Sequence, residues 1–247
     1  MRSVCIWLLA LCCPVAHAQE KEPTNPEATE VYQPVPPRVV PGTGGSPPSD
    51  AIRLFQGEDL DQWISSVDST AAPWTLNPDG SMSVKNRSGN IQTKRNFGSV
   101  QLHLEWRSPE KVGGKGQGRG NSGVFLSGLY EIQILDNNDN DTYTNGQVGS
   151  LYKQYVPLAM ASVPTGQWNS YDIIYHAPVF DKGQKVRSGT MTLIHNGVLV
   201  LDHVEIMGTT PYIGWPKNVP HGPGPLLLQD HYDNSRVSFR NIWIREL

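Results

Sequence analysis

The segment YEIQILD, residues 130–136, places a carboxylate and an amide within an otherwise apolar run. Successive side chains of a strand point to opposite faces, so Glu131 and Gln133 share the face opposite Ile132 and Ile134. A solvated strand face would carry Thr, Ser or Lys at such positions. A carboxylate held there can act as a base or a nucleophile, and Asp136 follows directly after the strand.

Two other segments have the same alternation. In QLHLEWR, residues 101–107, the polar face carries His103, Glu105 and Arg107. In LLLQDH, residues 226–231, Gln229 and His231 share a face. Three strands therefore offer groups that can bind or transfer protons, and carboxylates gathered in a concave site are a functional signature. The alternative is that each is the ordinary solvated face of an antiparallel sheet.

Short alternating or apolar runs, separated by Gly, Pro and Asn, recur at a spacing of roughly ten residues through the chain after position 51. Asn196-Gly197 stands between TLIH and VLVLD, which is typical of a tight hairpin. Helical periodicity is weak throughout. The pattern predicts an all-β fold, namely a two-sheet antiparallel β-sandwich of the jelly-roll type.

Residues 1–18 have the composition of a secretory signal peptide. A basic start at Arg2 precedes an apolar run, and Ala16-His17-Ala18 has the small-x-small form of a cleavage site. The apolar run is too short to span a bilayer, and no later stretch is long and apolar enough. We therefore expect an exported mature chain, periplasmic or extracellular, without a transmembrane segment.

Residues 19–50 are rich in Pro, Gly and Ser, which predicts a disordered, partly polyproline tether ahead of a domain at 51–247. All three cysteines lie in residues 1–18, so the mature chain has no thiol for disulfides or cysteine metal sites. Loss of Arg2 with the signal peptide changes the formal net charge from −3 to −4. An acidic chain without a basic block is a poor candidate for binding nucleic acid.

Six segments follow one another along the domain: LFQGEDLDQW, FGSVQLHLEWR, GNSGVFLSGLYEIQILD, PTGQWNSYDIIYH, LIHNGVLVLD and GPLLLQDH with VSFRNIWIREL. With these segments the chain resembles the 3-keto-disaccharide hydrolase family from Ile52 to Leu247. The resemblance implies a concanavalin-like lectin and glucanase fold, in which the concave face of a curved sheet holds sugar. It also implies that the groove is lined by Glu105, Arg107, Asn121, Glu131, Gln133, Gln229 and His231, with Asp136 at its rim.

The resemblance further implies a carbohydrate substrate already oxidised at C3 of one ring. A ketone at C3 acidifies the hydrogen on C2, so a base can remove it; the enolate then expels the glycosidic oxygen from C1, and water adds later. Such a site needs a base, an acid for the leaving group and a group that stabilises the enolate oxygen. We assign Glu131 as the base, with Glu105 as the alternate, and His231 as the acid. Arg107 or Asn121 would polarise the ketone.

Two further side chains are candidates for contacting a carbohydrate. His103 lies on the same expected face as the carboxylates, and Trp215, in the loop segment YIGWPKN, could stack on a sugar ring. The glycine-rich segment 112–120 is interpreted as a loop beside the cleft. A strand follows its G-x-G-x-x-G letters, where a dinucleotide site would require a helix.

No cofactor and no metal are expected. The segment DNNDNDTYTNGQ, which starts at Asp136, matches a calcium loop at its first, third and fifth positions. Asp141 and Gln147 stand where such a loop needs Gly and Glu, so an EF-hand is excluded and an irregular Ca²⁺ site is a minor alternative. The chain has no H-E-x-x-H segment that would favour a zinc site.

Three other functions stay open. A conventional glucan glycosidase is the first, since Glu131 and Asp136 partly match the E-x-D-x-x-E arrangement of glucanases of related fold. A lectin-like module that binds glycans without chemistry is the second, because the same fold serves both. A wall- or matrix-associated structural domain is the third, and the tether is its only support. Turnover of a 3-keto-glycoside would distinguish the proposed enzyme from all three.

Overall fold

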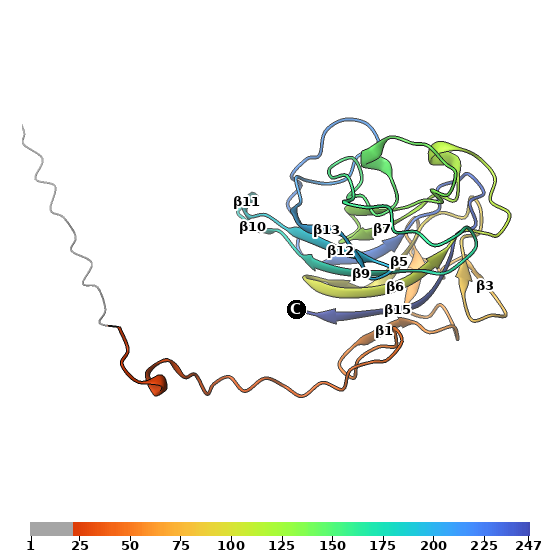
Figure 1. The fold of residues 1–247 in the computed structure, drawn as a ribbon. Helices are drawn as coiled ribbons and strands as arrows, with labels where there is room; N and C mark the ends of the chain where they lie inside the picture. Colours follow the sequence, from red (N-terminus) through yellow and green to blue (C-terminus); the bar gives the residue numbers. More distant parts are fainter. Residues whose placement is uncertain (1–21) are drawn as a thin grey trace, which may run out of the picture. The chain divides into compact units, whose positions relative to one another are not determined.

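The structure is a computed structural model that describes residues 22–247; the predicted signal peptide at 1–18 lies outside the described residues. The chain divides into two units between Arg38 and Val39. In the first unit, η1 (Pro26–Thr29) is a single 3-10 turn. The second unit, residues 39–247, contains the strands (Figure 1).

Eight strands form the larger sheet, and their pairings are antiparallel. The order is β13-β12-β9-β6-β15-β4-β3, and β1 also pairs with β15. The bounds are β1 (Ile52–Phe55), β3 (Thr75–Leu76), β4 (Met82–Ser83), β6 (Val100–Arg107), β9 (Asn169–His176), β12 (Thr190–His195), β13 (Val198–Glu205) and β15 (Ser238–Glu246).

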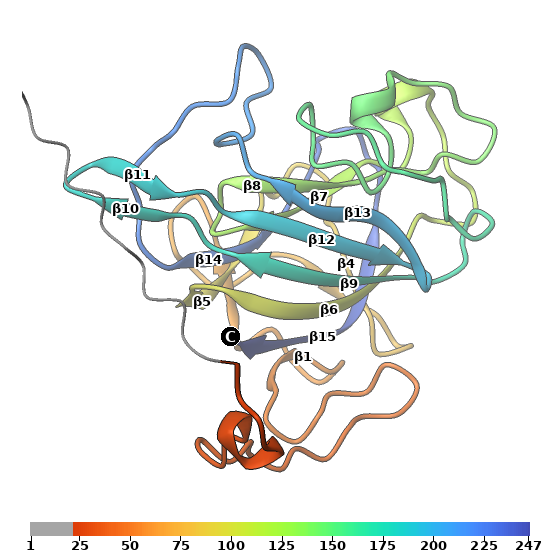
Figure 2. The ribbon, with the colours of Figure 1, turned by 60° about the vertical axis from the view of Figure 1, so that its left-hand side comes forward.

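Five strands form the smaller sheet, in the order β2-β5-β14-β7-β8, which packs behind the larger one (Figure 2). The bounds are β2 (Trp63–Ser65), β5 (Ile91–Phe97), β7 (Ser122–Leu126), β8 (Tyr130–Ile134) and β14 (Gly224–Leu228). A separate hairpin consists of β10 (Val179–Asp181) and β11 (Gln184–Arg187), while η2 (Gly116–Gly118) and η3 (Thr144–Gly146) lie in loops. The predicted antiparallel β-sandwich is confirmed.

The hydrophobic core lies between the two sheets. Leu102 and Leu104 of β6 and Ile132 and Ile134 of β8 are fully buried, as the alternation in both segments predicts. Burial of one such side chain stabilises the fold by about 1.5–3 kcal/mol. Both strands must therefore turn their polar faces away from the core.

Asn196 and Gly197 form the tight turn between β12 and β13. Both residues have positive φ, 50° and 79°, and His195 pairs with Val198 across the turn. Two consecutive positive φ values favour the Asn-Gly dipeptide in a two-residue hairpin. The predicted hairpin is confirmed.

The compact unit begins at Val39, before the predicted domain start at residue 51. The Gly45 carbonyl accepts hydrogen bonds at 2.9 Å from the Trp243 indole and from the Asn241 amide, which fixes this segment on the larger sheet. Asp50 accepts a 2.7 Å bond from Arg245. Specific polar contacts thus hold a segment whose composition predicts no order.

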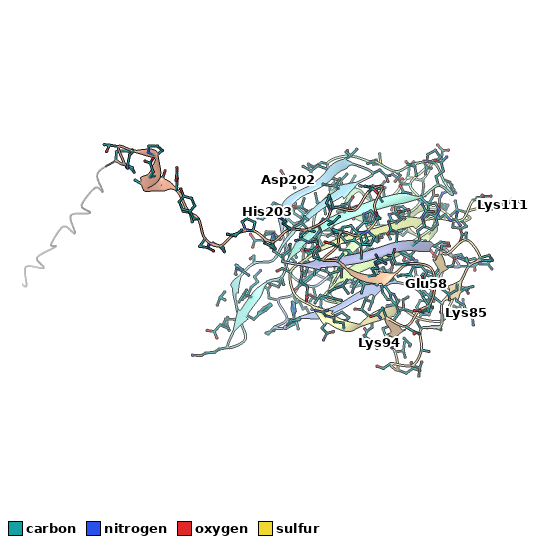
Figure 3. The ribbon with its side chains drawn as sticks, turned by 90° about the horizontal axis from the view of Figure 1, so that it is seen from below. Glu58, Lys85, Lys94, Lys111, Asp202 and His203 are labelled. Atoms are coloured by element: carbon teal, nitrogen blue, oxygen red, sulfur yellow. The ribbon has the colours of Figure 1, made fainter. Side chains whose placement is uncertain are left out.

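The periphery of the domain is charged. Figure 3 shows Lys85, Lys94, Lys111 and Asp202 projecting from it, and all four are exposed. Within residues 22–247, none of the helical segments has the length and apolar character needed to cross a bilayer.

Candidate active site

A polar cavity of about 240 Å³ lies on the outer face of the smaller sheet. Its floor comes from β7, β8 and the chain after β14, and loops wall it on the other sides. The lining residues are Gln117, Asn121, Phe125, Glu131, Gln133, Tyr152, Thr210, Tyr212, Gln229 and His231. The loops explain why every residue of β8 is buried although the strand alternates. Glu131 and Gln133 therefore face an enclosed cavity instead of bulk water.

Glu131 is positioned by a glycine on the neighbouring strand. A Cβ atom at Gly123 would lie 2.6 Å from Glu131 Oε1 and 2.9 Å from Phe125 Cε2, so a larger residue would displace the carboxylate or the ring. The Glu131 backbone N–H donates to Thr210 Oγ1 at 3.1 Å, which ties the covering loop to β8. The Gln133 amide nitrogen donates to Gln117 Oε1 at 2.8 Å, which ties the glycine-rich loop to β8.

Burial raises the pKa of Glu131 to about 8, and the positive charge of Lys153 partly opposes this shift. The side chain is only 5% exposed, so the ionised form loses most of its hydration. A proton-transfer group works best when its pKa lies near the working pH. Glu131 therefore has the properties of a general base or acid at neutral pH.

Two amide oxygens beside Glu131 are buried without a hydrogen-bond partner among residues 22–247. They are Asn121 Oδ1 and Gln229 Oε1. The Asn121 amide nitrogen already donates to the Gln117 carbonyl at 2.7 Å. Buried acceptors without partners are costly, so these oxygens are suited to accept bonds from ligand hydroxyl groups.

His231 supplies an imidazole to the cavity. Its Nδ1 lies 3.0 Å from Asp233 Oδ2, so Nε2 is the nitrogen left to contact a ligand. Burial alone would raise the pKa of Asp233, but its bonds to His231 and Ser235 lower it. An ionised aspartate behind the ring orients the imidazole through its Nδ1.

The prediction that Glu105, Arg107 and His103 share a groove with Glu131 is wrong. These three belong to β6, which pairs with β9 and β15 in the larger sheet, whereas Glu131 is on β8 of the smaller one. Both strands turn apolar side chains to the common core, so their polar faces point to opposite sides of the sandwich. Arg107 instead donates to Asp79 at 2.6 Å.

Glu105 and His103 line a separate cavity of about 730 Å³ on the outer face of the larger sheet. His103 Nδ1 lies 2.7 Å from Asp172 Oδ1, and Glu105 Oε2 accepts a 2.6 Å bond from Arg240. Burial alone would lower the pKa of His103, but bonds to Asp172 and Glu105 raise it to about 9. Burial alone would raise the pKa of Glu105, but bonds to His103 and other partners lower it to about 2. Groups locked in their charged forms make an ion-pair network and are poor bases at neutral pH.

Asp136 follows β8 but does not line the cavity. Its Oδ2 accepts a 2.6 Å bond from Ser108, and its Oδ1 accepts bonds from Thr165 at 3.1 Å and Arg119 at 3.3 Å. These bonds join the loop between β6 and β7 to the loop between β8 and β9, which is a structural role. The predicted contact of Asp136 with a substrate has no support from this position.

Trp215 is 87% exposed in the loop between β13 and β14. It does not line the cavity, although Tyr212 of the same loop does. Stacking of Trp215 on a sugar stays a prediction. Within the described part of the chain, His, Cys, Asp and Glu side chains form no group of three that could hold a metal ion.

Several cavity residues were not identified from the sequence. Gln117 comes from the glycine-rich loop, Tyr152 from the segment LYKQY, and Thr210 and Tyr212 from the loop before β14. None lies in a periodic run. An isolated bridge between Ile132 and Leu151 brings the LYKQY segment beside β8, and no local pattern predicts that contact.

The structure thus defines a class of protein: an antiparallel β-sandwich whose smaller sheet carries a cavity with a buried carboxylate and an oriented imidazole. The chain belongs to the family described as the 3-keto-alpha-glucoside-1,2-lyase-like domain, which matches residues 50–245. This match confirms the resemblance found in the sequence and identifies a carbohydrate-active protein.

Solved structures agree with the family. A "putative glycosyl hydrolase" from Parabacteroides distasonis ATCC 8503 is 50% identical, covers 90% of this chain and 97% of its own, and superposes with a TM-score of 0.87. Another from the same organism, 24% identical, covers 80% of this chain and 99% of its own with a TM-score of 0.55, and it shows the fold alone. No curated protein matches the chain.

Proposed function

We propose that this protein cleaves glycosides that carry a ketone at C3 of one ring, by removing the C2 proton and eliminating the leaving group. The supporting observation is the composition of the cavity. Glu131, with a pKa of about 8, and His231, held by Asp233, line the same space. This pair supplies the base and the acid that the elimination needs.

The steps follow from these two side chains. Glu131 takes the C2 proton, and the electron pair of the C–H bond forms an enolate with its negative charge on the C3 oxygen. Collapse of the enolate restores the C3 carbonyl, forms a C1–C2 double bond and breaks the C1–O bond. The departing oxygen receives a proton from His231. Water then adds to the double bond in a hydrolase, or the unsaturated keto sugar leaves in a lyase; neither outcome needs a redox cofactor.

The size of the cavity favours a single sugar ring. A water molecule takes up about 30 Å³ of liquid, so 240 Å³ has room for about eight waters. This is the scale of one monosaccharide unit, and the leaving group would lie outside. Asn121 Oδ1 and Gln229 Oε1 would accept bonds from the ring hydroxyl groups.

A conventional glycosidase is less well supported. Such enzymes place two carboxyl groups beside the scissile bond. Among the described residues that line the cavity, Glu131 is the one carboxylic acid, so a second carboxyl group is missing. Asp136 is bonded to loop residues outside the cavity. A lectin site would need neither a carboxyl group with a pKa near neutral pH nor an oriented imidazole.

We also propose that the chain is exported after cleavage behind Ala18, as the composition of residues 1–18 predicts. The mature protein would then begin at Gln19. Amino-terminal sequencing of the protein recovered outside the cytoplasm would detect this end. Recovery with residues 1–18 still attached would contradict the proposal.

The test of the function is turnover of a 3-keto-glucoside by Glu131→Gln, with Glu105→Gln as the matched control on the other sheet. Loss of the base should lower kcat by about 10²–10⁴-fold, while the control should retain the rate. Equal loss in both variants, or full rate in Glu131→Gln, would contradict the assignment of the base. Binding of the substrate without any release of sugar by the wild type would favour the lectin.

A further inference from the structure

The proposed elimination needs a hydrogen-bond donor for the C3 oxygen, where negative charge develops. The two donors considered from the sequence do not fill this role. Arg107 lies on the other sheet, bonded to Asp79. Asn121 uses its amide nitrogen on Gln117 and presents an oxygen to the cavity. The donor is therefore sought among the other residues that line the cavity.

Tyr152 brings a buried hydroxyl group to the cavity. It lines the cavity and is 6% exposed. Its backbone N–H donates to the Glu131 carbonyl at 3.0 Å, so the ring is fixed next to the proposed base. Burial raises the pKa of Tyr152 above its ordinary value, which keeps the phenol protonated and available as a donor.

A second tyrosine orients this hydroxyl. The Tyr143 and Tyr152 hydroxyl groups are hydrogen-bonded to each other, and their rings pack edge to face with centroids 6.2 Å apart. Either hydroxyl can be the donor in this bond. When a ligand oxygen accepts from Tyr152, Tyr143 can turn its own hydrogen to the Tyr152 oxygen. A bond chain of this kind polarises the terminal O–H and strengthens the bond that it donates.

Lys153 places a positive charge behind the same pair. Its ammonium group lies 5.4 Å from the Tyr152 ring centroid, 5.9 Å from that of Tyr143 and 5.0 Å from that of Tyr212. It also donates to the Tyr212 carbonyl, which fixes the side chain. A cation in a partly desolvated aromatic surrounding stabilises negative charge nearby.

We propose that Tyr152 donates a hydrogen bond to the C3 oxygen of the substrate and stabilises the enolate, with Tyr143 and Lys153 as positioning residues. This inference rests on the proposed function. As Glu131 takes the C2 proton, the electron pair moves onto the C3 oxygen, and Tyr152 holds this charge without transferring its own proton. When the C1–O bond breaks, the pair returns to restore the carbonyl.

The test is Tyr152→Phe, which removes one oxygen, measured with a 3-keto-glucoside labelled with deuterium at C2. Loss of a single oxyanion donor costs about 10²–10³ in kcat, so we expect that decrease, an equal decrease in the rate of label loss and little change in KM. Tyr143→Phe should lose less, because it only orients the donor. Tyr155→Phe is the matched control, since Tyr155 packs against the core outside the cavity.

A second variant covers the case in which Tyr152→Phe folds poorly. Incorporation of 3-fluorotyrosine at position 152 keeps the ring and makes the hydroxyl a stronger donor, so the rate of label loss should rise. Full turnover by a folded Tyr152→Phe, or an unchanged rate with fluorotyrosine, would overturn the inference while leaving the proposed function intact. A wild-type protein that releases no sugar would overturn both.

Discussion

Replacing Glu131 by Gln should stabilise the protein, and increasingly so as the pH rises. The carboxyl group has a pKa of about 8 in the folded state, against an ordinary value of 4.5. Below 4.5 both states are protonated and the group has no effect. Between 4.5 and 8 the unfolded state loses the proton while the folded state keeps it, so stability falls as the pH rises through this interval. Gln cannot ionise, and the variant should lack this decline.

The size of the effect follows from the shift. One pKa unit corresponds to 1.36 kcal/mol, so a rise from 4.5 to about 8 corresponds to about 5 kcal/mol, reached fully above pH 8. Glu131 is buried, so solvent screens the shift little. The loss equals a large part of the 5–15 kcal/mol that typically stabilises a domain. Glu131 would thus lower the stability of the fold, and a catalytic role would explain why a carboxyl group is kept at this buried position.

Urea unfolding of both proteins at a series of pH values from 4.5 to 9 measures the difference directly. The free energy of unfolding of the variant minus that of the wild type should increase by several kcal/mol across this range. Any constant effect of the amide cancels in the slope. A difference that stays flat with pH would show that Glu131 keeps an ordinary pKa, and the argument for a proton-transfer role would fail.

Three further predictions concern other positions. Gly123→Ala should displace Glu131, because its Cβ would lie 2.6 Å from Oε1, and should lower kcat by up to about 100-fold with the fold intact; an unchanged kcat would contradict this geometry. His103→Gln should destabilise the fold by about 1.5–3 kcal/mol without changing kcat. Because the pKa of His103 is raised to about 9, this loss of stability should be complete below pH 6.5 and vanish above pH 9. A loss of stability that grows with pH would contradict the ion pair with Asp172. Trp215→Ala should raise KM for disaccharides if the exposed indole stacks on the leaving sugar, and an equal KM would end that prediction.

Alternation in the sequence was sufficient to give the faces of the strands. Leu102 and Leu104 point inward and Glu105 outward, and Ile132 and Glu131 divide in the same way. Alternation depends on neighbours along one strand, so it could not assign β6 and β8 to different sheets. That assignment depends on pairings such as Ser238 with Arg107, which join residues far apart in the chain.

The positions of the loops that complete the cavity could not be predicted from the sequence, for a related reason. Gln117, Tyr152 and Tyr212 come from segments without periodicity, and their positions depend on contacts that form only in the folded domain. Burial by these loops is also what raises the pKa of Glu131. The sequence could therefore identify the residue but not the property that suits it to chemistry.

The central claim is that Glu131 removes the C2 proton of a keto sugar, and the fate of a deuterium label at C2 tests it most directly. With the wild-type protein, the label should pass to solvent as the leaving group is released. With Glu131→Gln, the label should be lost no faster than in a control without protein. A sugar released with its C2 deuterium intact would mean that the glycosidic bond breaks without proton removal at C2, which contradicts the mechanism.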